Sequence, residues 1–219
     1  MIVVKEVLNL NEYDLFIVDF DGTIVDTMKM WKEICPNFVL SLNKVPSDDI
    51  YQKITSKTNI EISNFVRDEY LPEYSYEEVT EMFFEFIKSQ YILQDIKPNA
   101  IKLLEDLNKE GNVVLYSATA GSVLDVLLNK FDLKKYFSAI YSGSDLGITK
   151  KDGTGYLKVI ELAGGCNKAL VVEDAIHAII GARSQNLDVL AILDYSNCTR
   201  LETVNEYATY LIDLNEYKK

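Results

Sequence analysis

Two acids stand at alternate positions after an apolar run, and a glycine follows them directly: Asp19, Asp21 and Gly22. Two carboxylates at one strand end repel each other unless a positive charge lies between them, and a divalent cation with oxygen ligands is the simplest solution. Gly22 permits a sharp turn that brings backbone N–H groups close to a ligand. The segment therefore predicts a cation site at the end of a buried strand, with an ordinary Asp-Gly turn as the alternative.

Two further polar groups end apolar segments in the same way. The Ser117 hydroxyl and the N–H groups around Ala118 follow residues 113–116 and are suitable donors to a phosphate oxygen. A helix N-cap is the alternative role for this serine. Glu173 and Asp174 follow a third apolar run, where they either complete a cation site or merely suit the dipole of a following helix.

These groups need a scaffold that brings strand ends together. The predicted strands are 15–20, 113–116, 139–141, 169–172, 189–193 and a short one at 210–212. Helices are expected from Pro98 to Gly111, over 122–131, from a Thr154 cap to Gly164, and over 175–185 with Asn186 as a left-handed stop, with a loop over 142–153. This alternation predicts an α/β fold with a doubly wound, mainly parallel sheet. Ligands of such sheets bind at the carboxyl ends of the strands, where the polar groups stand.

Residues 25–93 interrupt the alternation, because their apolar residues recur at helical spacing without strand alternation. Ser47 or Asp48 is expected to cap one helix, and Ser75 with the acids after it marks the start of another. The expected domains are an α/β core of residues 1–24 and 94–219 and an inserted small all-helical cap of residues 25–93.

Asp-Phe-Asp-Gly-Thr at 19–23 resembles the first motif of the haloacid dehalogenase superfamily, whose phosphatase and phosphomutase members carry Asp-x-Asp. Ser117 resembles the second motif, Glu173-Asp174 resembles the fourth, and the helical insertion lies where this superfamily places its first-type cap. The resemblance covers about residues 15–194 and favours the branch that contains phosphatases and β-phosphoglucomutases.

The third motif of this superfamily is a lysine before the helix that leads to the fourth motif. Lys150 and Lys151 are the candidates, with two solvated lysines as the alternative. The family often places an aromatic residue six positions after the lysine, and Tyr156 has that spacing from Lys150, which is therefore preferred. The chain departs from the family in lacking two prolines beside the lysine, in Ala175 for the usual serine and in Ala178 for a frequent further acid.

The resemblance implies a role for each matched residue. Asp19 would be the nucleophile that forms an aspartyl-phosphate, and Asp21 would protonate the leaving alcohol and then activate water. The implied catalytic residues are Asp19, Asp21, Ser117 and Lys150. The implied phosphate-binding residues are Ser117, Ala118, Lys150 and Gly22. The implied Mg²⁺ ligands are Asp19, Asp21 through its backbone carbonyl, Asp174 and Glu173.

These roles predict a Mg²⁺-dependent phosphatase that acts on a small phosphorylated metabolite. A sugar phosphomutase is the alternative enzyme, although the resembling β-phosphoglucomutases carry a cap histidine where this chain has Trp31. A catalytically weak binding or regulatory protein is the alternative from another class, disfavoured because unused clustered carboxylates cost stability. Neither the substrate nor the oligomeric state follows from the sequence.

The composition excludes several other classes. The chain has 219 residues, of which 48% are hydrophobic and 26% charged, so it is globular, and a net charge of −12 argues against partners such as nucleic acid or anionic membranes. Cys35, Cys166 and Cys198 are too widely spaced for a zinc site and fit free thiols in a reducing compartment. No apolar run marks a signal peptide or a membrane span, so a cytoplasmic protein is expected. His177 is expected on the partly exposed start of a helix.

Overall fold

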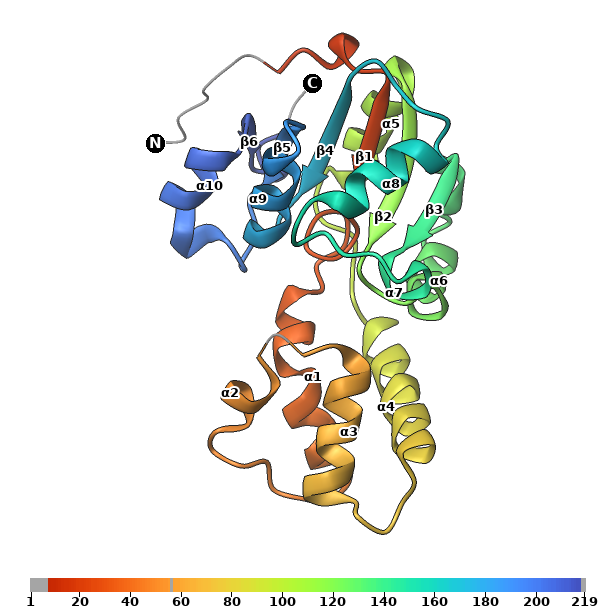
Figure 1. Cartoon of the computed structure of the whole chain (residues 1–219), viewed down its shortest axis with the longest axis vertical. Helices are drawn as coiled ribbons and strands as arrows, with labels where there is room; N and C mark the ends of the chain where they lie inside the picture. The colour runs from red at the N-terminus through yellow and green to blue at the C-terminus, as the bar shows by residue number, and fades with distance from the viewer. Residues whose placement is uncertain (1–7, 56, 218–219) are drawn as a thin grey trace. The chain divides into compact units, whose positions relative to one another are not determined.

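The computed structural model describes residues 8–55 and 57–217. The first seven residues of the N-terminal lead-in, on which part of the signal-peptide prediction rests, therefore lie outside the described residues. The chain divides into two compact units, Met1–Met28 with Gln94–Lys219 and Lys29–Leu93. Figure 1 shows the first as an α/β unit and the second as a group of helices.

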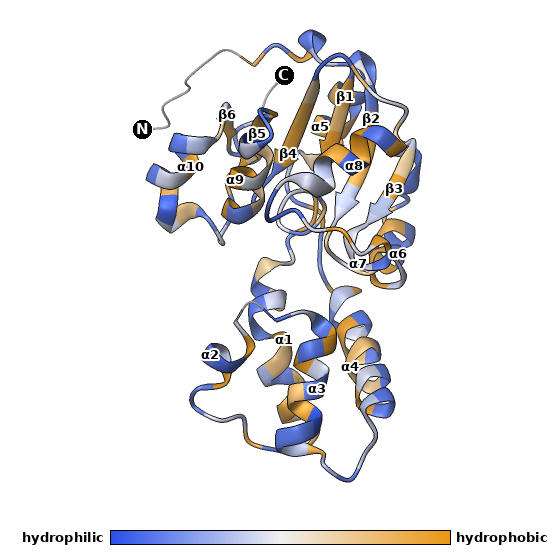
Figure 2. Ribbon diagram, in the orientation of Figure 1, coloured by the Kyte–Doolittle hydropathy of each residue, from blue (hydrophilic) through white to orange (hydrophobic). Residues whose placement is uncertain are grey.

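The α/β unit is built on a six-stranded parallel sheet with strand order β3-β2-β1-β4-β5-β6. The strands are β1 Leu15–Val18, β2 Asn112–Ser117, β3 Ala139–Ser142, β4 Ala169–Glu173, β5 Asp188–Ile192 and β6 Tyr210–Ile212. All four residues of β1 are buried between β2 and β4, which explains its unbroken apolar sequence, orange in Figure 2. The predicted α/β fold with a doubly wound parallel sheet, including the short sixth strand, is confirmed.

Helices cover both faces of this sheet. They are α5 Ala100–Glu110, α6 Gly121–Lys130, α7 Gly143–Leu146, α8 Thr154–Leu162, α9 Ile176–Ser184 and α10 Leu201–Tyr207, with 3-10 turns η1 Leu10–Glu12, η2 Lys134–Tyr136 and η3 Cys198–Arg200. One core cluster joins Ile17 of β1 to Tyr156 of α8, Ile179 of α9 and Val204 of α10. Phe16 points to the opposite face and is equally buried, because alternate residues of a strand face opposite sides of the sheet.

Two predicted helix starts are wrong by one or two residues. The sequence predicts Pro98 inside the first turn of a helix, but α5 begins only after Asn99, which adopts a left-handed conformation with φ 55°. Thr154 is predicted to cap its helix, but it is the first residue of α8 and Gly153, with φ 79°, is the N-cap. The N–H and hydroxyl of Thr154 instead donate to Asp152 Oδ1 at 3.1 and 2.7 Å.

The predicted loop over 142–153 is partly wrong, because it contains the short helix α7. The Ser142 side chain caps this helix by accepting a hydrogen bond from Asp145 N at 3.1 Å. The predicted left-handed stop at Asn186 is confirmed, with φ 58°. The predicted strand 15–20 is also too long, because β1 ends at Val18. The other strands end within one residue of their predicted ends.

The described residues of the second unit form helices and connecting loops, with no strand. Its helices are α1 Met28–Ser41, α2 Ile50–Ile54, α3 Asn59–Tyr70 and α4 Tyr76–Tyr91. Ser75 starts α4 as predicted, in a reciprocal capping box with Glu78. The prediction of Ser47 or Asp48 as a cap is wrong, because Asp49 is the N-cap of α2 and makes no side-chain capping bond. None of the described helices, in either unit, combines the length and the apolar character needed to cross a membrane.

Candidate active site

Carboxylates gather at the carboxyl ends of β1 and β4. The two strands pair in register, with Val18 opposite Val172, so Asp19 follows beside Glu173. The Asp19 N–H donates to the Val172 carbonyl at 2.9 Å and extends the ladder to the first acid. Among the described residues, Asp19, Glu173 and Asp174 form one group of buried acids whose ligand oxygens lie within 4.8 Å of one another.

Lys150 supplies a positive charge inside this group of acids. Its buried ammonium pairs with Asp19 Oδ1 and, at 2.7 Å, with Glu173 Oε2. Tyr156 also donates its hydroxyl to Glu173 Oε2, at 3.0 Å. The Lys150 ammonium lies 5.1 Å from the centre of the Tyr116 ring, whereas the side chain of Lys151 is exposed. Of the two lysines left open by the sequence, Lys150 is the one that reaches the carboxylates.

The charges of this buried group do not balance. Asp19, Glu173 and Asp174 provide three carboxylates and Lys150 one ammonium. Burial, and then the charge of Glu173, raise the pKa of Asp19 to about 7 and that of Asp174 well above its ordinary value. Burial opposes the charge of Lys150, but the two carboxylates raise its pKa above the ordinary value. A divalent cation would offset the remaining negative charge, and a cluster of carboxylate oxygens suits Mg²⁺.

Asp21 lies in different surroundings from Asp19, because hydroxyl groups rather than charges hold it. Thr27 donates to Asp21 Oδ1 at 2.8 Å, and Thr119 donates to Oδ2 at 2.7 Å. The Ser117 hydroxyl lies 3.4 Å from the same Oδ2 and accepts a hydrogen bond from the Thr119 N–H. Asp21 is half-buried, so this second carboxylate is more accessible than the first.

The comparison with protein families matches most of the chain. A family model described as "Haloacid dehalogenase-like hydrolase" matches residues 16–192, which include both carboxylate-bearing strand ends and Lys150. The chain belongs to the haloacid dehalogenase-like hydrolases. The family and the hydrolase class predicted from the four motifs are therefore confirmed.

Individual proteins are similar to this hydrolase in sequence or in fold. A phosphoglycolate phosphatase from Agrobacterium fabrum is 29% identical over 184 residues, which cover 78% of this chain and 76% of the relative. The structure of CbbY from Rhodobacter sphaeroides, solved in complex with phosphate, has a TM-score of 0.73 at 13% identity and covers 91% of this chain and 93% of that chain. A HAD hydrolase of family IA, variant 3, from Entamoeba histolytica has a TM-score of 0.73 at 21% identity, with 94% and 95% covered.

Gly22 of this hydrolase packs directly against the Asp174 carboxylate. Its φ is 82°, a backbone conformation that residues with a side chain rarely adopt. A Cβ at this position would overlap Asp174 Oδ2 and would lie 2.7 Å from Met28 Cγ. The glycine therefore allows the turn after Asp21 to approach the acid that ends β4.

We expect Gly22→Ala to destabilise the hydrolase by about 3 kcal/mol, since the left-handed backbone costs about 1–2 kcal/mol and the overlap with Asp174 adds a similar amount. Gly147→Ala is the matched control, because Gly147 also has a positive φ, 65°, but a Cβ there would have no neighbouring atom within 4 Å. Chemical denaturation of both variants measures the difference. Equal losses at the two positions would show that contact with Asp174 does not restrict residue 22.

Sequence reasoning missed several residues that contact the acids. Thr119 holds Asp21, and Thr23 and Ser196 donate hydroxyls to Asp174. Thr23 follows Asp21 by two residues, and Thr119 follows Ser117 by two residues. This spacing from the motif residues could have indicated both threonines. Ser196 lies after β5, where only the pairing of β4 with β5 brings it near Asp174.

Two of the residues considered from the sequence are exposed in the structure. Ala118 is exposed between the buried residues Ser117 and Thr119, and its methyl side chain carries no polar atom. His177 is the exposed second residue of α9, as predicted for the start of a helix. The structure thus brings together Asp19, Asp21, Gly22, Ser117, Lys150, Glu173 and Asp174.

Proposed function

We propose that this hydrolase is a Mg²⁺-dependent phosphatase that removes phosphate from a small phosphorylated metabolite through an aspartyl-phosphate on Asp19. The observation that carries the proposal is the different surroundings of Asp19 and Asp21. Asp19 is buried against an ammonium group, whereas Asp21 is half-buried and held by hydroxyls. Two carboxylates in different surroundings can divide the roles of nucleophile and general acid–base.

The roles of the protein groups follow from these positions. An Asp19 oxygen forms a bond to phosphorus while the bond to the leaving oxygen breaks, and Asp21 gives that oxygen a proton. Asp21 then takes a proton from the water that attacks the aspartyl-phosphate, so it returns to its starting state. Thr119 fixes the Asp21 carboxylate during both transfers, and Lys150 and Ser117 stabilise the charge of the phosphoryl oxygens.

The same proposal assigns the metal ligands. Asp19, Asp174 and the backbone carbonyl of Asp21 would hold Mg²⁺, with Glu173 acting directly or through water. When bound, the ion supplies Lewis acidity and orients the phosphoryl group. The unbalanced charge of the buried carboxylates and their shared position at two strand ends support this assignment.

Release of inorganic phosphate from a panel of phosphorylated compounds tests the proposal. The relative from Agrobacterium fabrum is named a phosphoglycolate phosphatase, so phosphoglycolate heads the panel, followed by sugar phosphates and an aryl phosphate. We expect release in Mg²⁺ and none in EDTA. A protein that binds Mg²⁺ but releases phosphate from no compound would instead be a binding protein on the same fold.

We further propose the helical residues 25–93 as the cap domain that selects among substrates.

Mg²⁺ is expected to raise the melting temperature more at about pH 8 than at about pH 6, because binding must displace protons from Asp19 and Asp174. The pKa of Asp19 is raised from 3.8 to about 7, so the stability that its proton contributes is present below about pH 4 and is lost as the pH rises through about 7. The metal compensates for this loss.

Thermal unfolding with Mg²⁺ or EDTA at the two pH values measures the effect. In Asp174→Asn, which keeps the shape of the side chain but loses its charge, the shift is expected to vanish. A shift that is independent of pH, or one that persists in Asp174→Asn, would contradict the metal assignment.

The enzyme is expected to hydrolyse hexose 1-phosphates rather than isomerise them. The phosphomutase alternative needs a histidine that returns the phosphoryl group to the sugar, and Trp31 occupies the corresponding position. An indole cannot act as a base near neutral pH. The centre of the Trp31 ring lies 5.8 Å from the centre of the Tyr91 ring. Incubation with hexose 1-phosphate, Mg²⁺ and a trace of the bisphosphate decides the matter. Conversion to the 6-phosphate without phosphate release would overturn the phosphatase proposal.

A further inference from the structure

Both oxygens of the Asp174 carboxylate accept hydrogen bonds from hydroxyl groups. Thr23 donates to Oδ1 at 3.2 Å and Ser196 donates to Oδ2 at 2.9 Å. Asp174 is fully buried, so these donors replace the water that a carboxylate would otherwise bind. A carboxylate offers about four acceptor sites, so the two hydroxyls fix its orientation and leave sites for a cation.

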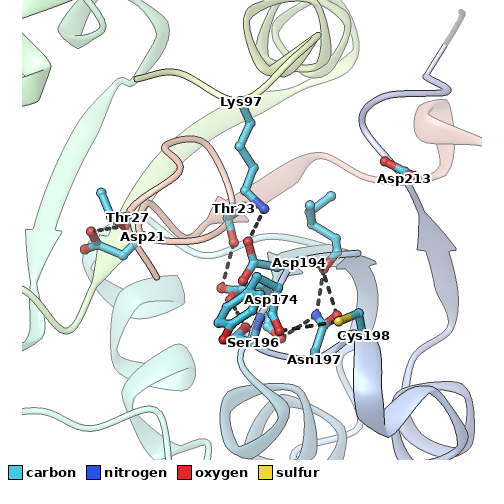
Figure 3. Close-up of polar contacts among 12 residues, drawn as sticks. Asp21, Thr23, Thr27, Lys97, Asp174, Asp194, Ser196, Asn197, Cys198 and Asp213 are labelled. Carbon is cyan, nitrogen blue, oxygen red and sulfur yellow. Dashed lines mark hydrogen bonds and ion pairs between the residues drawn. The ribbon is translucent and has the colours of Figure 1, made fainter. Parts of the chain in front are cut away.

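Ser196 comes from a loop after β5 that is tied to two strand ends. Asn197, which is fully buried, donates from Nδ2 to the carbonyls of Asp174 and Ile192, each at 2.8 Å. Its Oδ1 accepts from the Asp194 N–H at 3.0 Å, and the Ser196 N–H donates to Asp194 Oδ1 at 2.7 Å. These hydrogen bonds attach the loop to the ends of β4 and β5. They hold the Ser196 hydroxyl next to the Asp174 carboxylate (Figure 3).

A buried ion pair links this loop to the loop that carries Thr23. The Lys97 ammonium lies 2.5 Å from Asp194 Oδ2, and the two side chains are only 8% and 2% exposed. The Lys97 N–H also donates to the Ile24 carbonyl, next to Thr23, at 2.9 Å. Lys97 thus contacts both hydroxyl-bearing loops, and Figure 3 draws the contact of its ammonium with Asp194.

We propose that Ser196 is a positioning residue for the metal ligand Asp174, and that the Lys97–Asp194 pair fixes the loop from which it acts. This assignment rests on the proposed phosphatase function. Ala175 and Ala178, which follow Asp174 in the chain, have no polar side chain that could do the same work. A hydrogen-bonded partner of a metal ligand sets the orientation and charge of that ligand, and its loss typically weakens metal binding or activity about 10–100-fold.

Titration of the metal-free protein with Mg²⁺, followed by thermal unfolding, tests the assignment without any substrate. In Ser196→Ala we expect the Mg²⁺ concentration for a half-maximal stabilisation to rise about tenfold or more. Ser196→Thr keeps the hydroxyl and should recover the wild-type concentration. Cys198→Ala changes an exposed residue of the same loop that does not contact Asp174, and should behave as wild type.

Phosphate release as a function of Mg²⁺ concentration gives a second readout. In Ser196→Ala the half-activating Mg²⁺ concentration should rise by the same factor, while the rate at saturating Mg²⁺ returns to near the wild-type value. A lower melting temperature in EDTA with an unchanged Mg²⁺ requirement would show a merely structural role and overturn the assignment. Equal weakening in Ser196→Ala and Ser196→Thr would also overturn it, because size rather than the hydroxyl would then matter. If Mg²⁺ did not stabilise the wild-type protein, the proposed function would fail together with this assignment, and the wild-type titration alone would reveal it.

Discussion

Asp19→Asn is expected to lower phosphate release by about 10⁴–10⁶-fold, the loss seen when other hydrolases lose their nucleophile. The amide has nearly the shape of the carboxylate, but it does not attack phosphorus. Steady-state phosphate release at saturating Mg²⁺ measures the effect. Near-normal release by this variant would exclude Asp19 as the nucleophile.

The same variant should fold, and in EDTA at about pH 8 it should melt higher than the wild type. Burial and the charge of Glu173 disfavour the ionised form of Asp19, as its raised pKa shows, and the amide carries no charge. The substitution lowers the excess of negative charge in the buried group by one. A lower melting temperature would show that the ion pair with Lys150 contributes more than this repulsion costs.

Lys150→Met is expected to destabilise the metal-free protein by about 3–5 kcal/mol, because it leaves buried carboxylates without their partner. The Lys150 ammonium contacts both Asp19 and Glu173, and both are buried. Phosphate release should fall by about 10²–10³-fold, since a charge that stabilises the phosphoryl oxygens is lost. Denaturation in EDTA and activity in Mg²⁺ measure the two effects separately.

Lys151→Met is the matched control for that variant. Lys151 is the neighbouring residue, carries the same side chain and is exposed, so its loss should change stability by less than about 0.5 kcal/mol and leave activity unchanged. Similar losses in both variants would show that the charge of the loop, and not the contact with Asp19, matters.

The sequence could predict the acids of the site because each lies at the end of an apolar strand. Runs such as 15–18 and 169–172 mark buried parallel strands, and parallel strands bring their carboxyl ends to one edge. Asp19 and Glu173 therefore had to meet once β1 and β4 became neighbours. The choice of Lys150 over Lys151 needed the spacing to Tyr156, whose hydroxyl contacts the same Glu173 as the lysine.

Sequence could not predict the groups that depend on loop conformation. The loop after β5 contains four consecutive polar or aromatic residues, 194–197, and nothing local shows that Ser196 is the one that reaches Asp174. The contact exists because Asn197 bridges the two strand ends. One of its hydrogen bonds joins it to Asp174, 23 positions earlier in the chain. Helix α7 was missed because four residues are too few for a helical period to appear.

The identity of the residue that becomes phosphorylated tests the central claim most directly. In Asp21→Asn with an aryl phosphate and Mg²⁺, the leaving group departs without needing a proton, but no general base activates the attacking water. We therefore expect a burst of about one released aryl alcohol per chain, and mass spectrometry after an acid quench should find one phosphoryl group on the peptide that contains Asp19. The wild-type protein, quenched during its first turnover, provides the control. Phosphate release by the wild type with no phosphoryl group on this peptide in either protein, or with the group on another residue, would contradict the account.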